Sequence, residues 1–155
     1  MTFEKLIEML GAKLGVEFGD AGGAVAVETD GTIVILQDAG ELLLLRAEVG
    51  EMPPDAKAAV LASAMEANFL YQGTGGATLA INPADGKLHV HKYNWMERLD
   101  VDAVIDAIDK LSDTTAAWRR ILSDCRSGAS SGDAPTLGEL DDRRMRLGEG
   151  DFMQV

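Results

Sequence analysis

The sequence predicts an α+β domain with the order α-β-β-β-α-β-β-α, in which helices flank an antiparallel sheet. Apolar residues recur at helical spacing near the N-terminus and again after Asp100. Short β-rich runs separated by turn residues occupy positions 24–49, and a second pair of such runs occupies positions 77–93. Because the turns between neighbouring runs are short, the strands that they join are expected to be antiparallel.

The first helix is predicted at the N-terminus. Thr2 is placed to cap it, Glu4 suits the positive end of the helix dipole, and Gly15 is placed to end it. Its apolar face is formed by Phe3, Leu6, Ile7, Leu10 and Leu14.

Three strands are predicted next, in the runs AVAVE, TIVIL and ELLLLRAEV. Asp30-Gly31, between the first two runs, is a strong hairpin signal because glycine tolerates the positive φ of a tight turn. Residues 33–36 and 42–45 are apolar on both faces, which predicts central strands that are covered on both sides or await a partner.

A second helix is predicted after Pro53 and Pro54, in an alanine-rich run whose apolar residues fall on several faces. Such a helix is expected to be buried on more than one side. A second hairpin follows, in ATLAI, the turn NPADG and KLHVHKY, and a third helix runs from its cap Asp100 to a point before Gly128. Residues 1–126 are therefore predicted to form one domain, and the Gly/Ser-rich, mixed-charge residues 127–155 a flexible tail.

Composition excludes several classes of function. The formal net charge of −12 disfavours nucleic acid and anionic membranes as partners. The N-terminus lacks the pattern of a signal peptide, and apolar runs such as residues 42–45 are far shorter than the roughly 20 residues that cross a bilayer. The single cysteine, Cys125, forms no intramolecular disulfide and is expected to be half-buried near a helix end. We expect a cytoplasmic protein without membrane insertion.

No pattern in the sequence predicts catalysis, a cofactor or a metal. The GTGG run at positions 73–76 follows a helix and leads into a strand, which is the reverse of a phosphate-binding loop. His89 and His91 share one strand face, but no cysteine or carboxylate at ligand spacing completes a metal set, so a solvated strand face is favoured. A small enzyme with a pocket near these histidines is the weakest interpretation.

Apolar surface is the remaining unusual feature. Two uses are open: self-association through the alanine-rich helix, and capture of an extended client along the first helix and a sheet edge. A well-filled monomeric core is the structural alternative.

The segment ANFLYQGTGGATLAINPADGKLHVHKY, with the order of elements around it, resembles the class I chaperones of type III secretion systems, the Tir-chaperone-like family. The matching positions are Asn68, Thr74, Gly76, Leu79, Asn82, Pro83, Gly86 and Leu88, with Ala47, Gly50 and Pro53 in LLRAEVGEMP. The resemblance covers roughly residues 2–125. It is a diffuse pattern without a catalytic signature.

The resemblance implies a secretion-chaperone-like fold and a cytoplasmic homodimer that holds the N-terminal chaperone-binding segment of a secreted effector in extended, export-competent form, without catalysis. By position it implies a client-binding surface of Phe3, Leu6, Leu10, Val25, Val27, Ile33, Ile35, Leu43 and Leu45. It likewise implies a dimer interface of Val60, Leu61, Ala64, Met65, Asn68 and Phe69. Sequence does not separate core from surface within these sets.

Two further hypotheses stay open. Apolar residues of the tail are either disordered or occupy the client groove of the same or a neighbouring molecule; they are Leu137, Leu140, Met145, Leu147 and Phe152. The alternative function is that of a small regulatory or sensory domain of similar α+β fold that binds a folded partner protein.

Overall fold

The computed structural model describes residues 1–19 and 22–127. Its helices are α1 (Phe3–Leu14), α2 (Lys57–Asn68) and α3 (Val101–Arg126). Its strands are β1 (Ala24–Thr29), β2 (Thr32–Ala39), β3 (Leu42–Gly50), β4 (Thr78–Ile81) and β5 (Leu88–Trp95). This is the predicted α-β-β-β-α-β-β-α order. The predicted tail lies outside the described residues, apart from Ser127.

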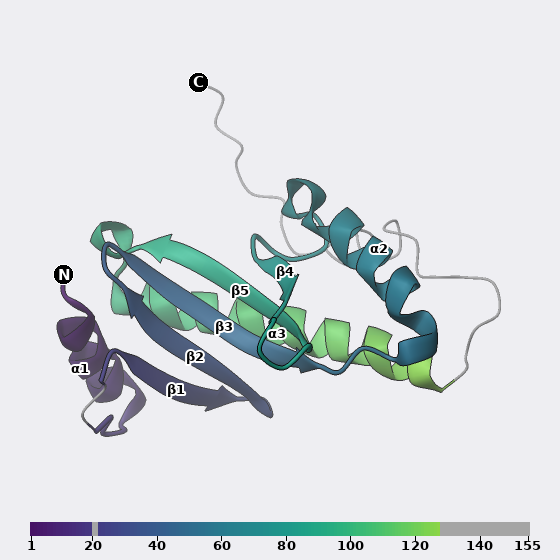
Figure 1. Cartoon of the computed structure of the whole chain (residues 1–155). Coiled ribbons are helices and arrows are strands. Elements are labelled where there is room, and N and C mark those ends of the chain that lie inside the picture. The colour runs from purple at the N-terminus through teal and green to yellow at the C-terminus, as the bar shows by residue number, and fades with distance from the viewer. Residues whose placement is uncertain (20–21, 128–155) are drawn as a thin grey trace, which may run out of the picture.

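All five strands form one antiparallel sheet in the order β1-β2-β3-β5-β4 (Figure 1). The β1-β2-β3 meander and the β4-β5 hairpin are joined by pairing between β3 and β5, which places β1 and β4 at the two edges. The long helix α3 lies behind the sheet, while α1 and α2 lie towards its opposite ends (Figure 1).

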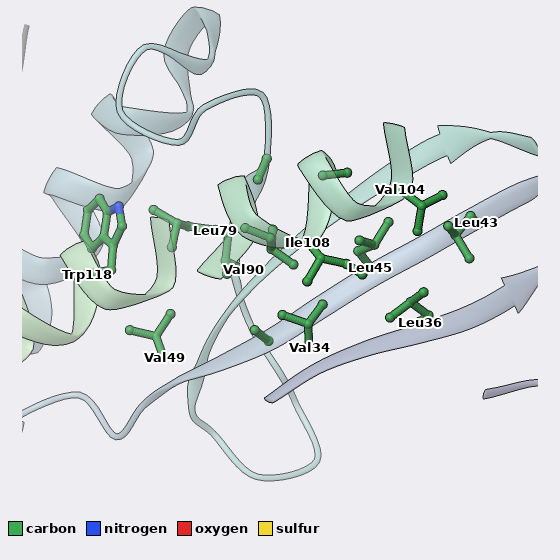
Figure 2. Packing of buried hydrophobic residues seen from close by; sticks show 14 of the residues in the cluster. Val34, Leu36, Leu43, Leu45, Val49, Leu79, Val90, Val104, Ile108 and Trp118 are labelled. Carbon is green, nitrogen blue, oxygen red and sulfur yellow. The ribbon is translucent and has the colours of Figure 1, made fainter. Parts of the chain in front are cut away.

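The core lies between α3 and one face of the sheet. Side chains of β2 and β3, such as Val34 and Leu45, point towards Val104 and Ile108 of α3 (Figure 2). Phe3, Leu6 and Leu10 of α1 belong to the same buried cluster. The sheet therefore has one face covered by helices, which we call the covered face.

Local signals in the sequence explain the element boundaries. The side chain of Thr2 accepts a hydrogen bond from the Lys5 amide, and Asp100 accepts one from the Ala103 amide at 2.7 Å. Gly15 ends α1 with a left-handed φ of 70°. Asp30 and Gly31 both have positive φ, as the predicted two-residue hairpin turn requires.

One prediction about burial needs correction. Helix α2 buries a single stripe, formed by Val60, Ala64 and Ala67, because it packs beside the short edge strand β4 and little else covers it. Of the two alternatives predicted for the central strands, coverage on both faces is not found, since burial alternates along β2 and β3 and leaves one face open. Among the described residues no helix is long and apolar enough to span a bilayer.

Candidate functional site

The sheet face opposite α3, which we call the open face, carries a band of apolar and polar side chains. Strand register puts these residues together, because partners in an antiparallel pair point to the same side. Ile35 of β2 pairs with Arg46 of β3, and Arg46 pairs with His91 of β5. The open face comprises Ile33, Ile35, Gln37, Leu42, Leu44, Arg46, Glu48, His89, His91, Tyr93 and Trp95.

Large apolar side chains on the open face are exposed to an unusual degree. Ile33 is 56% exposed, Tyr93 54% and Trp95 50%. Tyr93 lies opposite Leu44 and Trp95 opposite Leu42, so the aromatic rings extend an apolar band along β3 and β5. Such a band on a small domain is typical of an interaction surface.

A hollow of about 270 Å³ opens on this face between β3, β5 and β4. Its lining is formed by Leu44, Arg46, Ala80, Ile81, Asn82, His89, His91 and Tyr93. The rings of His91 and Tyr93 meet edge to face, with centroids 6.0 Å apart. Burial, with a smaller effect of the neighbouring His89, lowers the pKa of His91 below its usual value of 6.5, which favours a neutral imidazole.

A polar cluster stands at one side of the hollow. The Asp85 carboxylate accepts hydrogen bonds from the Lys87 amide and the Asn82 side chain, and it lies 3.3 Å from His89 Nε2. The bond from the Lys87 amide is the main cause that lowers the pKa of Asp85. Lys87 Nζ lies 2.8 Å from Glu48 Oε1, and this contact raises the pKa of Lys87.

This cluster corrects one expectation from sequence, namely that no carboxylate at ligand spacing completes a set with the histidines. One ligand atom each of Glu48, Asp85 and His89 lies within 4.8 Å of the others. The Asp85 carboxylate accepts hydrogen bonds from Asn82 and the Lys87 amide, and Glu48 accepts one from the Lys87 side chain. Both carboxylates of the cluster therefore have hydrogen-bond partners within the chain.

A second apolar surface lies at the C-terminal end of α2. We call the exposed side chains Met65, Phe69, Leu70 and Tyr71 the α2 tip. Met65 is 74% exposed and Phe69 68%. Leu70 and Tyr71 have left-handed φ values of 53° and 57°, a conformation that costs a non-glycine residue about 1–2 kcal/mol.

Contacts with the rest of the domain hold the α2 tip in place. The Asn68 side chain donates to the Leu79 carbonyl at 3.0 Å and accepts from the Leu79 amide at 2.9 Å, as a neighbouring strand would. A Cβ atom on Gly73 would lie 2.6 Å from the Ala67 Cβ, so only glycine allows the loop to return this close to α2. Trp118 of α3 donates to the Gly73 carbonyl at 3.4 Å.

The predicted client-binding residues fall into two groups. Ile33 and Ile35 lie on the open face, whereas Val25 and Val27 are half-buried and pair with the buried residues Leu36 and Val34 of the covered face. The others have side chains that are buried in the core of the single chain; they are Phe3, Leu6, Leu10, Leu43 and Leu45.

The predicted dimer residues are divided in the same way. Val60 and Ala64 are buried against the domain, Leu61 is half-buried, and Asn68 is half-buried and bonded to β4. Met65 and Phe69 are exposed in the α2 tip.

Several side chains of the two apolar surfaces are absent from the predicted sites. The half-buried Leu44 and the exposed Tyr93 and Trp95 lie on the open face, and the exposed Leu70 and Tyr71 complete the α2 tip. Strand parity offers a signal for Tyr93 and Trp95, because they continue the face of His89 and His91. No comparable signal marks Leu70 and Tyr71, since their exposure depends on a left-handed turn that leucine and tyrosine do not favour.

Solved structures share this fold. A chain of the HopA1–SchA chaperone–effector complex matches with a TM-score of 0.61 at 20% identity, covering 76% of this chain and 93% of that one. A chain of the heterodimeric ExoU–SpcU complex from the type III secretion system of Pseudomonas aeruginosa matches with a TM-score of 0.64 at 19% identity, covering 75% and 97%. YbjN, a putative transcription regulator from E. coli, matches with a TM-score of 0.56 at 16% identity, covering 81% and 93%.

Sequence comparison gives the family. No curated protein sequence matches the chain. The sequence profile of the Tir chaperone protein (CesT) family matches residues 5–119, which contain all the strands and the two apolar surfaces described above. The chain therefore belongs to the Tir chaperone protein (CesT) family, the type III secretion chaperones.

Proposed function

We propose that this chain is a type III secretion chaperone that binds the N-terminal segment of a secreted effector in extended form and keeps it competent for export. The observation that carries the proposal is the presence of two separate exposed apolar surfaces, the open face and the α2 tip. One chain leaves both uncovered, and one lies on the sheet while the other lies at the end of α2, so they can serve two different partners.

The α2 tip is the proposed contact with a second copy of the chain. Its side chains project from one short segment, and a two-fold axis beside α2 brings the same side chains of both copies together. The alanine-rich exposed side of α2, which includes Ala58, Ala59 and Ala62, allows another helix to approach closely.

The sheet is the proposed contact with the client. Strand β1 is an edge strand, so its outer backbone groups have no strand partner among the described residues and are available to an extended segment. The open face beside it offers Ile33 and Ile35 to alternate side chains of such a segment. The two complexes above, each of which contains an effector or a partner chain by its name, support this use of the fold.

A pull-down from lysate of the native cell, followed by a mass measurement of the purified complex, tests the proposal. We expect two copies of the chain with one secreted protein, and we expect removal of that protein's N-terminal segment to abolish binding. The same pull-down is repeated with the double variant Ile33→Asp/Trp95→Asp. This variant is the matched comparison for the wild type, since both substitutions affect only the open face. A captured protein that binds through a folded domain contradicts the proposal.

The alternative is a regulatory domain that binds a folded protein. The likeness of YbjN, named as a putative transcription regulator, shows that proteins with other names share this fold. The alternative predicts that the captured partner binds as a purified, folded protein. It also predicts that the isolated N-terminal peptide of that partner does not bind.

A further inference from the structure

Arg46 occupies the centre of the open face without a partner of opposite charge. It lies between Ile35 of β2 and His91 of β5 in register, with Leu44 and Glu48 two residues away on its own strand. Within residues 1–19 and 22–127 its guanidinium makes no ion pair or side-chain hydrogen bond. Glu48, the carboxylate nearest along the strand, is bound by Lys87 at 2.8 Å.

This arrangement leaves the donors of Arg46 available to an anion. Arg46 is half-buried, and its guanidinium nitrogens are not among the buried, unpartnered atoms of the described residues, so they still reach solvent and can meet a bound group. The chain as a whole is strongly acidic, with a net charge of −12. An unpaired positive side chain in a hollow therefore makes the local electrostatic potential less negative than that of the rest of the surface. A carboxylate is the complementary group, because the guanidinium fork matches its two oxygens.

The size of the hollow indicates what brings that carboxylate. Its volume of about 270 Å³ lies below the roughly 300–1,000 Å³ of small-molecule pockets. Apolar walls from Leu44, Ala80 and Ile81 surround the polar groups. Space of this size and mixed lining suits one or two amino-acid side chains.

The apolar band beside the hollow determines how far an apolar client residue lies from the acidic one. Leu44 and Leu42 follow Arg46 at alternate positions of β3, and Tyr93 and Trp95 lie opposite them. Alternate side chains of an extended peptide point to the same side, with the same period of two residues. A peptide that lies along β3 therefore brings the side chain two residues from the Arg46 partner over Leu44 and Tyr93, and the side chain four residues away over Leu42 and Trp95.

We propose that the Arg46 hollow receives an Asp or Glu side chain of the client segment, paired with Arg46, with an apolar client residue two positions away on Leu44 and Tyr93, where the band that continues to Trp95 begins. This inference rests on the proposed function and adds a specificity rule to it. The rule is acidic–any–apolar, in either chain direction.

A displayed library of random 12-residue peptides, selected on the full-length protein, tests the rule. We expect enriched peptides to carry Asp or Glu two residues from an apolar residue. Arg46→Glu is expected to lose this preference or to select Lys or Arg instead, and Arg46→Gln is a milder variant should the charge reversal impair folding. Arg120→Glu is the matched control, because Arg120 is exposed on α3, behind the covered face, and carries the same change of charge.

A second measurement uses one enriched peptide and its Glu→Gln version in fluorescence anisotropy. The wild-type protein is expected to bind the Glu version about fivefold or more tightly, since a hydrogen bond to a charged group is being removed. Arg46→Gln is expected to bind both versions equally, which is the signature of a direct pair in a double-mutant cycle.

Each outcome separates this inference from the proposed function. If no peptide is enriched, the proposed function fails and the rule fails with it. If peptides are enriched without an acidic position, or with one that Arg46→Glu leaves unchanged, the rule alone fails and peptide capture stands. If Arg46→Glu instead changes the mass of the free protein, the occupant of the hollow is a second copy of this chain, which also overturns the rule.

Discussion

Asn68→Ala tests how the α2 tip is attached to the sheet. The Asn68 amide makes two hydrogen bonds to the backbone of Leu79, at 3.0 and 2.9 Å, and Leu79 is 5% exposed. Alanine leaves a buried N–H and a buried C=O without partners. At about 1–3 kcal/mol for each unsatisfied group, and with some relief from water at the sheet edge, we expect a loss of about 2–4 kcal/mol in the free energy of unfolding.

Urea unfolding followed by circular dichroism measures this loss as a lower midpoint at unchanged slope. Glu66→Ala is the control, because Glu66 is exposed on the same helix and its removal is expected to change stability by no more than about 0.5 kcal/mol. Both variants are compared at one protein concentration, since self-association adds to apparent stability. If Asn68→Ala unfolds within about 0.5 kcal/mol of the wild type, these hydrogen bonds do not anchor α2, and the account of the tip is wrong.

Three further predictions address the two surfaces and the hollow. Phe69→Asp is expected to halve the mass of the free protein in light scattering without changing its circular dichroism, because Phe69 is largely exposed in the single chain; an unchanged mass would place the self-contact elsewhere. Trp95→Ala is expected to weaken capture of an enriched peptide about tenfold or more while lowering the free energy of unfolding by less than about 1 kcal/mol, as measured by anisotropy and urea unfolding; a large loss of stability with intact binding would assign Trp95 to the fold. Burial holds the pKa of His91 below 6.5, so the unfolded chain takes up the proton first and stability is lost as the pH falls from about 6.5 towards the lower folded value. His91→Gln is therefore expected to lose less melting temperature than the wild type between pH 7 and pH 5, and equal losses would show that His91 is not desolvated.

Local signals allowed the elements to be predicted from the sequence. Thr2, Asp100 and the Asp30-Gly31 turn act within three or four residues of themselves, so their effect is independent of the rest of the fold. The order of elements and the antiparallel sheet followed from such signals. The long third helix was equally clear, because its apolar stripe is sustained from Val101 to Leu122.

The faces of the strands were harder to predict. The run Leu42–Leu45 is apolar throughout, so it gives no alternation. The family resemblance implied Leu43 and Leu45 as client residues, and both are buried in the core of the chain. For the first hairpin, the turn length in the sequence does determine which residues share a face. A two-residue turn pairs Val27 with Val34 and therefore separates Val27 from Ile33 and Ile35, which point to the other side.

The pairing of strands that are distant in the chain could not be predicted from the sequence. The β3–β5 pairing that brings Arg46 beside His91 joins positions far apart in the chain, and it contains an irregularity between Glu48 and Gly50. The Arg46 hollow depends on this pairing. The periodicity of apolar residues within β3 or β5 does not indicate that these two strands pair.

The state of the client segment in the complex tests the central claim most directly. Hydrogen exchange measured on the captured protein, free and bound, distinguishes an extended segment from a folded domain. We predict new protection confined to a stretch of the N-terminal region, together with protection of β1 and β3 in this chain, while the remainder of the client is unchanged. Protection spread over a folded client domain, with none at β1 or on the open face, would contradict the account.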